Sequence, residues 1–201
     1  MYYLSDISRG EFHDLGSSFE CELIPLSHPD ELKSVQEEFK KRHPKADHYP
    51  YAFRFDELSR SSDDGEPSGT GGRALLSLLE QKQLGRCLIM VARFFGGTKL
   101  GIPRLRRAFV GSGEDAIAQA TLFVEQEQYV YHLEISYSLY SVLEKNQTRY
   151  GYQLKNTSFD VNVVTDLYSM RIMDEPWEKM GLNPTLLIAP RKDMLLVEAK
   201  V

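Results

Sequence analysis

The chain has 201 residues, of which 42% are hydrophobic, 26% charged and 11% aromatic. This is the mix of an ordinary globular protein, so collagen-like, disordered and coiled-coil chains are excluded. A net charge of -5, from 24 basic and 29 acidic side chains, argues against a protein that coats nucleic acid with its whole surface, but it leaves room for a local basic patch.

Hydrophobic runs and cysteines point to a cytoplasmic protein. The longest uninterrupted apolar stretch, Cys87 to Ala92, is far shorter than the roughly 20 residues of a membrane helix. The first residues, MYYLSDISRGEF, lack a basic segment followed by an apolar one, so we expect no secretory signal and no membrane partner. Cys21 and Cys87 each lie in an apolar run and are too few for a disulfide framework or a CxxC site, so both are expected to be buried.

Strands and helices alternate in the first part of the chain. Apolar positions alternate from Phe19 to Leu26 and again from Tyr49 to Leu58, which is typical of strands. Between them, residues 29–43 place apolar side chains on one face of a helix that stops before Pro44. The segment from Ser59 to Gly72 is rich in Gly, Pro, Ser, Thr and acids, and we expect it to be a loop.

The next elements follow at regular spacing. A helix is predicted from Ala74 to Leu84, and the run from Cys87 to Phe95 is nearly all apolar, as in a central strand covered on both faces. A second glycine-bearing loop, Gly96 to Pro103, leads into a helix that ends near Ala120.

Near residue 125 the pattern changes, and we place a domain boundary there, giving domains 1–125 and 126–201. The later order of strand, helix, strand, strand, helix and strands resembles the split βαβ of a ferredoxin-like unit. The expected strands are at 129–135, 150–154, 159–164, 186–188 and 195–199, and the expected helices at 139–146 and 168–180. The predicted fold class is α+β with two domains.

The glycine-rich loop before the helix at Ala74 is a candidate anion site. Ser68, Gly69, Thr70 and Gly71 precede the helix, whose first N–H groups attract phosphate. Alternatively, the glycines only supply the positive φ of a tight turn. The loop is neither a Walker A motif nor a dinucleotide-binding GxGxxG, so ATP hydrolysis by that route is unsupported.

Three carboxylates and one histidine form a second candidate site. Asp63, Asp64 and Glu66 crowd three carboxylates together and would suit a divalent metal ion or a general base. The alternative is a solvated acidic turn that accepts local backbone hydrogen bonds. His48 is either a base or phosphate contact, or a partly buried, hydrogen-bonded residue.

A basic segment runs from Arg86 to Arg107 without a single acidic residue. Lys99, Arg104 and Arg107 lie on its loop and on the first turns of the following helix, where they would attract phosphates or an acidic partner. Alternatively, the acidic loop at residues 63–66 neutralises this face through salt bridges.

Three blocks of the sequence resemble the IMPACT/YigZ family. SDDGEPSGTGG at Ser62 matches the family's SDDGEPSGTAG, and RFFGGTKLGIPRLRRAF at Arg93 is similar to RYFGGIKLGTGGLVRAY. Ala46, His48, Ala52 and Arg54 match A-x-H-x-x-x-A-x-R. Where the family has a flexible TGG, this chain has Ile102-Pro103-Arg104, which removes a backbone cradle and adds a guanidinium able to pair with phosphate.

The resemblance implies an N-terminal domain like ribosomal protein S5 domain 2 and a C-terminal domain like domain V of elongation factor G, in proteins linked to translation. The leading hypothesis is a non-enzymatic regulator that binds RNA, the ribosome or a translation-related protein partner, without a cofactor. The residues expected to bind are Arg54, Ser68, Gly69, Thr70, Gly71, Lys99, Arg104 and Arg107.

Two alternatives stay open. One is an enzyme acting on a phosphorylated or nucleotide substrate, with His48 as base, Lys99 as electrophile and Asp64 beside them, and with Asp63, Asp64 and Glu66 around a metal ion. The other is a protein-interaction module without a ligand, which is favoured if the three sequence blocks brace one another.

Overall fold

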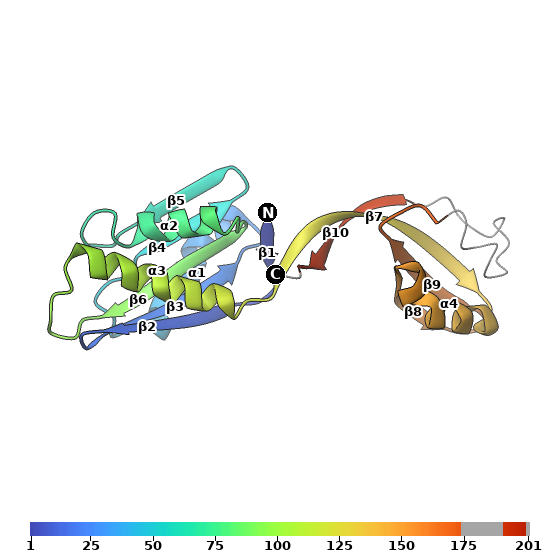
Figure 1. Ribbon diagram of the computed structural model, residues 1–201, viewed down its shortest axis with the longest axis horizontal. Helices are drawn as coiled ribbons and strands as arrows, with labels where there is room; N and C mark the ends of the chain where they lie inside the picture. Colours follow the sequence, from blue (N-terminus) through green and yellow to red (C-terminus); the bar gives the residue numbers. More distant parts are fainter. Residues whose placement is uncertain (174–190, 200–201) are drawn as a thin grey trace. The chain divides into compact units, whose positions relative to one another are not determined.

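The structure of the chain is a computed structural model that describes residues 1–173 and 191–199. The chain forms two compact units, one of Met1–Val124 with the chain end from Glu198, and one of Glu125–Val197. Each unit mixes strands with helices, which agrees with the expected α+β class (Figure 1).

The first unit is built on a five-stranded sheet in the order β2-β3-β6-β4-β5, with neighbouring strands antiparallel. Its strands are β2 Ser8–Asp14, β3 Ser17–Pro25, β4 Tyr51–Phe55, β5 Leu58–Ser62 and β6 Cys87–Phe94. Helix α1 (Leu32–Arg42), after a short 3-10 turn, packs on one face, and helices α2 (Gly72–Gln81) and α3 (Ile102–Ala118) pack on the other. A short strand, β1 (Tyr2–Leu4), pairs with residues 122–124 at the start of strand β7 (Leu122–Ile135).

Strand β6 is the centre of this unit, and its expected burial on both faces is confirmed. Cys87, Ile89 and Val91 face the α2–α3 side, while Leu88, Met90 and Ala92 face the α1 side. All six residues are fully buried. Side chains alternate across a strand, so a run without polar residues requires cover on both faces.

Helix α3 lies close against β2 because Gly10 has no side chain. A Cβ at Gly10 would come within 2.1 Å of the backbone nitrogen of Ala116. The hydroxyl of Ser8 donates a 2.6 Å hydrogen bond to the carbonyl oxygen of Ala116. Gly113 of α3 allows a similar approach to Leu78 and Ile89. The glycines inside this helix therefore serve packing, at the cost of helix propensity.

The loop expected at residues 59–72 is wrong in its first part, and two further strands were not predicted. Residues 58–62 form edge strand β5, which pairs with β4 although nearly all its side chains are exposed. β1 and β2 are likewise absent from the predicted elements. β2 and β5 lack the apolar alternation that predicts a strand, because backbone pairing to a neighbour holds them in place.

The second unit contains β7 (Leu122–Ile135) from Glu125 onward, α4 (Tyr137–Tyr150), β8 (Tyr152–Phe159), β9 (Val163–Ser169) and β10 (Arg191–Glu198). β9 lies between β7 and β8 and is antiparallel to both, while β10 pairs with β7. The core beneath α4 includes Tyr131, Leu133, Leu143, Tyr152 and Leu167.

Most expected elements of this unit correspond to observed ones, with three exceptions. The strand expected at 159–164 is displaced, because Phe159 ends β8, residues 160–162 connect the strands and β9 begins only at Val163. The helix expected at 168–180 is wrong at its start, where Tyr168 and Ser169 end β9. The rest of that helix from residue 174, and the strand at 186–188, lie outside the described residues.

Both cysteines are free and buried, as expected. Burial raises the pKa of both thiols, that of Cys87 to about 12. Within residues 1–173 and 191–199, no helix has the length and apolar character needed to span a membrane.

Candidate functional site

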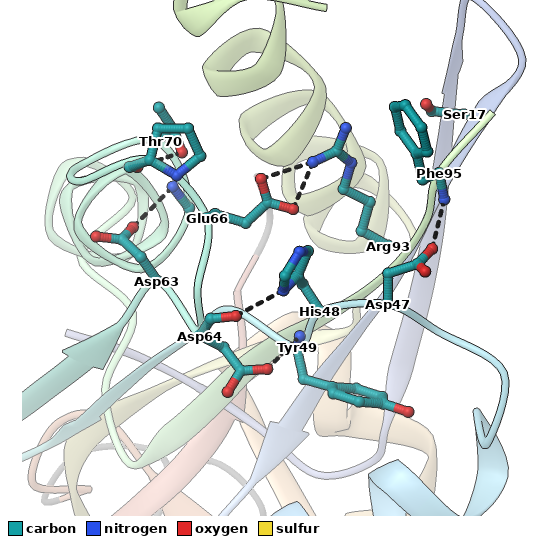
Figure 2. A network of polar contacts seen from close by, with 12 residues as sticks. Ser17, Asp47, His48, Tyr49, Asp63, Asp64, Glu66, Thr70, Arg93 and Phe95 are labelled. Atoms are coloured by element: carbon teal, nitrogen blue, oxygen red, sulfur yellow. Dashed lines mark hydrogen bonds and ion pairs between the residues drawn. The ribbon is translucent and has the colours of Figure 1, made fainter. Parts of the chain in front are cut away.

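A cavity of about 480 Å³ lies in the first unit where β6 ends and α3 begins. It is lined by Asp47, His48, Glu66, Pro67, Arg93, Phe95, Lys99, Leu100, Gly101, Ile102 and Leu105. These residues come from all three sequence blocks. The blocks therefore meet around one hollow. Figure 2 shows polar contacts among residues of these blocks at close range.

The first block runs beside the end of β6. The Arg93 N–H donates to the carbonyl oxygen of His48 at 3.0 Å, and the Asp47 N–H donates to the carbonyl oxygen of Arg93 at 2.8 Å. The Asp47 carboxylate accepts the Phe95 N–H at 2.7 Å. This pairing places His48 and Arg93 side by side at the floor of the cavity.

In the glycine-rich loop, the carboxylate of Asp63 already accepts the N–H groups that were expected to bind an external anion. The expected anion site at residues 68–71 is corrected accordingly. Asp63 accepts the N–H of Gly69 at 2.8 Å and the N–H groups of Gly71 and Gly72 at 2.9 Å. Thr70 is turned inward, with its N–H and its hydroxyl both donating to the Pro67 carbonyl. Ser68 is exposed. Since an aspartate occupies the start of α2, a phosphate would have to displace it.

Asp64 positions His48 through its backbone rather than through its carboxylate. The His48 Nδ1 lies 2.8 Å from the carbonyl oxygen of Asp64, which can only accept a hydrogen bond. Nδ1 therefore carries the hydrogen, and Nε2 of the neutral ring is left as an acceptor. The Asp64 carboxylate accepts the Tyr49 N–H at 2.8 Å, so Asp64 is absent from the cavity lining that contains His48 and Lys99.

Glu66 and Arg93 form a buried ion pair at the cavity. Nη1 of Arg93 donates to both carboxylate oxygens at 2.6 Å, and the two side chains are 1% and 9% exposed, respectively. The guanidinium carbon lies 5.6 Å from the ring centres of both Phe19 and Phe95, a cation–π geometry. The pair joins the glycine-rich loop to β6.

These contacts correct the metal site of the enzyme hypothesis. Asp63 binds N–H groups at the start of α2, Asp64 binds Tyr49 and Glu66 binds Arg93. In the part of the chain that the structure describes, no three His, Cys, Asp or Glu side chains gather as metal ligands.

The expected basic residues divide into three groups. Arg104 forms a two-point ion pair with Asp14 of β2 at 2.9 and 2.5 Å, and its guanidinium lowers the pKa of that carboxyl. Arg54 donates to the carbonyl oxygen of Leu84 and lies opposite Cys87, at the far end of β6 from Arg93. Six residues of strand separate the two ends by about 20 Å, so Arg54 is not part of the basic face around Lys99.

The third group forms no salt bridge. Lys99 and Arg107, together with Arg106, are exposed, and none has a hydrogen bond or salt bridge to the described residues. Arg107 nevertheless acts electrostatically on Asp14 and helps Arg104 to lower the pKa of that carboxyl. Lys99 lines the cavity. Arg106 and Arg107 border a second hollow of about 310 Å³ between α2 and α3. We call Lys99, Arg106 and Arg107 the α3 basic face.

Sequence reasoning missed Arg93, Phe95 and Ile102 as lining residues. Arg93 interrupts an otherwise apolar strand, and an unexplained charge in a buried strand is the signal that would have found it. Phe95 is 47% exposed and Ile102 is 61% exposed. Their exposure follows from the path of the loop, which composition does not reveal.

Comparison with known proteins assigns the family. The model of the Impact N-terminal domain matches residues 15–117. The IMPACT family member YvyE of Bacillus subtilis is 29% identical over 76% of this chain and 71% of its own. YigZ of Escherichia coli is 31% identical over 56% of this chain and 59% of its own. A crystal structure described as that of a hypothetical protein covers 84% of each chain with a TM-score of 0.59 at 23% identity, a likeness of fold. The chain belongs to the IMPACT family.

Proposed function

We propose that this chain is a non-enzymatic, translation-associated protein of the cytoplasm that binds RNA, free or in the ribosome, through the α3 basic face and the adjoining cavity. The observation that carries the proposal is that Lys99, Arg106 and Arg107 are exposed and form no salt bridge with the described residues, although Arg107 also acts on the Asp14 carboxyl. Exposed cations without salt bridges attract phosphate groups more strongly than salt-bridged ones.

The chemistry beside these cations favours RNA over an acidic protein surface. Phe95 and Lys99 line the same cavity, and nearly half of the surface of Phe95 is exposed. Exposed aromatic rings beside cations are the arrangement on which unpaired bases stack. The acidic remainder of the surface would restrict RNA to this face, since like charges repel phosphate elsewhere.

The family and the topology are consistent with this role. The IMPACT resemblance implies a link to translation. In the second unit, β9 lies between β7 and β8, while β10 pairs with β7, an order that supports a ferredoxin-like domain. A ribosomal protein S5 domain 2-like assignment for the first unit is part of the same proposal.

A fluorescence anisotropy titration with a labelled, partly single-stranded RNA at several salt concentrations tests the proposal. We expect saturable binding, and we expect the double variant Lys99→Ala, Arg107→Ala to bind at least tenfold more weakly. The salt dependence should fall by roughly one unit of slope for each phosphate-binding cation removed. The matched control is Lys33→Ala with Lys41→Ala, which removes the same charge from α1 on the opposite face of the sheet. Absent binding, or equally weakened binding in both double variants, would contradict the proposal.

A second candidate, an enzyme acting on a nucleotide or phosphorylated substrate, is favoured by one observation. The Nε2 acceptor of His48 and the Lys99 ammonium belong to residues that line one cavity, as a base and an electrophile would. Incubation with RNA and with nucleoside phosphates, followed by chromatography, separates the two candidates. A product that forms with the native chain and not with His48→Gln would favour the enzyme.

A further inference from the structure

The cavity at the end of β6 has an apolar wall and a polar floor. Leu100 and Leu105 are buried in it, while Phe95, Lys99 and Ile102 are exposed and form its rim. Its volume of about 480 Å³ lies within the range of roughly 300–1,000 Å³ in which proteins bind small molecules. A planar ring system with hydrogen-bonding edges suits these walls.

Charges inside the cavity cancel. Glu66 neutralises Arg93 in a buried pair, and His48 in its neutral form adds no charge. At the rim, Lys99 and Asp47 are both exposed; Lys99 forms no salt bridge within the described chain, and the Asp47 carboxylate accepts the Phe95 N–H but keeps its negative charge. A neutral group is therefore favoured inside, and an anionic group is favoured at Lys99.

Two polar groups of the cavity still have capacity for hydrogen bonds. Nε2 of His48 is an acceptor when Nδ1 donates to the Asp64 carbonyl. Nε of Arg93 is a buried donor without a hydrogen-bond partner among the described residues. A buried donor left unpaired is unfavourable. Because this atom has almost no exposed surface, a ligand acceptor gains affinity from it only when the side chains around it shift to admit the ligand. One acceptor and one donor match the edge of a nucleobase.

The ring of Phe95 provides the stacking surface. Arg93 lies 5.6 Å from the ring centre in a cation–π contact, which helps to orient the ring at the rim. Nearly half of the residue remains exposed. A base entering the hollow would pass this ring, and its phosphate would remain beside Lys99.

We propose that the cavity takes the base of one unpaired nucleotide of a single-stranded RNA, stacked against Phe95, with the adjoining phosphate bound by Lys99. This inference rests on the proposed function and deepens it, because it names the form of RNA that the first unit selects. Duplex RNA keeps its bases stacked and paired, so it would bind only through phosphate contacts on the α3 basic face.

The test uses a short uridine oligomer with one central 2-aminopurine, alone and annealed to a complementary strand. With the full chain we expect a saturable change in 2-aminopurine fluorescence for the single strand and little change for the duplex. Phe95→Ala should abolish most of this change and weaken single-strand binding about tenfold, since base stacking contributes that much affinity. Phe95→Leu, which keeps apolar bulk but lacks a flat ring, should behave in the same way. Phe159→Ala is the matched control, because this exposed phenylalanine lies in the second unit.

The outcomes separate the two proposals. If anisotropy rises on binding but 2-aminopurine fluorescence and affinity do not depend on Phe95, the cavity inference fails while RNA binding stands. If no RNA binds, both fail. If adenosine monophosphate competes as strongly as the oligomer, the ligand is a free nucleotide, and the assignment to single-stranded RNA is overturned.

Discussion

Arg93 donates from Nη1 to both carboxylate oxygens of Glu66, at 2.6 Å each, in a site where the two side chains are almost fully buried. The pair connects the glycine-rich loop to the central strand. It also supplies the polar floor of the cavity, so the stability of the first unit and the shape of its candidate site depend on the same contact.

The first prediction concerns this pair. Glu66→Leu should lower the free energy of unfolding by about 3–5 kcal/mol, because it leaves the charge of Arg93 buried without a partner. The double variant Glu66→Leu, Arg93→Met should lower the free energy of unfolding much less than the sum of the decreases in the two single variants. Urea unfolding followed by circular dichroism measures all three.

The control is an exposed ion pair. Asp56→Asn breaks the ion pair with Arg86, in which the two side chains are 52% and 41% exposed, and should cost at most about 1 kcal/mol. Additive effects of the two substitutions in the buried pair would mean that the two groups do not depend on each other.

The second prediction concerns Asp63, which accepts three backbone N–H groups at the start of α2. Asp63→Ala should destabilise the chain by about 1–2 kcal/mol, as the loss of an N-cap side chain does, because the N–H groups at the start of α2 lose their acceptor. Glu57→Ala removes the same charge from an exposed turn and should change stability little. If Asp63→Ala bound phosphate no better and unfolded like the native chain, the assigned capping role would be wrong.

The third prediction is a pH dependence at the ion pair of Asp14 and Arg104. Arg104 lowers the pKa of Asp14 from its ordinary value of 3.8, chiefly through their hydrogen bond. A lowered pKa in the folded state stabilises the protein above that ordinary value, and the stabilisation is lost as pH falls through the lowered pKa. The native chain should therefore exceed Arg104→Ala in stability at neutral pH, and the difference should shrink in acid.

Denaturant unfolding at a series of pH values measures this difference. Arg106→Ala is the control, since Arg106 lies on the same helix without a partner in the described residues. The role assigned to Arg104 is incorrect if its variant differs from the native chain by the same amount at every pH, or if Arg106→Ala shows the same pH dependence.

Elements that bury an apolar face could be predicted from sequence. β6 was predictable because its side chains are buried on both faces, and α4 because its apolar residues recur at helical spacing. β5 was not, since its side chains are almost all exposed and its partner β4 imposes its extended form. Tertiary pairing decides such strands, whereas composition favours a loop.

The sequence singled out the three blocks whose residues line the cavity, but not the roles of individual residues. Of the residues expected to bind, Lys99 alone lines the cavity, together with His48 of the enzyme alternative. The role of Asp63 depends on a loop that folds back over nine residues, from Asp63 to Gly72. Arg54 belongs to the same motif as His48, yet the extended chain carries it to the other end of the sheet. The spacing of residues along the sequence predicts which of them lie close together only where the secondary structure between them is already known.

The most direct test of the central claim is to map where RNA contacts the chain. A single-stranded RNA containing 4-thiouridine is bound to the full protein, crosslinked with long-wavelength light and digested, and the crosslinked peptides are identified by mass spectrometry. We predict that crosslinks concentrate between Arg93 and Arg107, with Phe95 among the modified residues, and that they disappear with Lys99→Ala, Arg107→Ala. Crosslinks confined to the second unit or to α1, or unchanged in that double variant, would contradict the account.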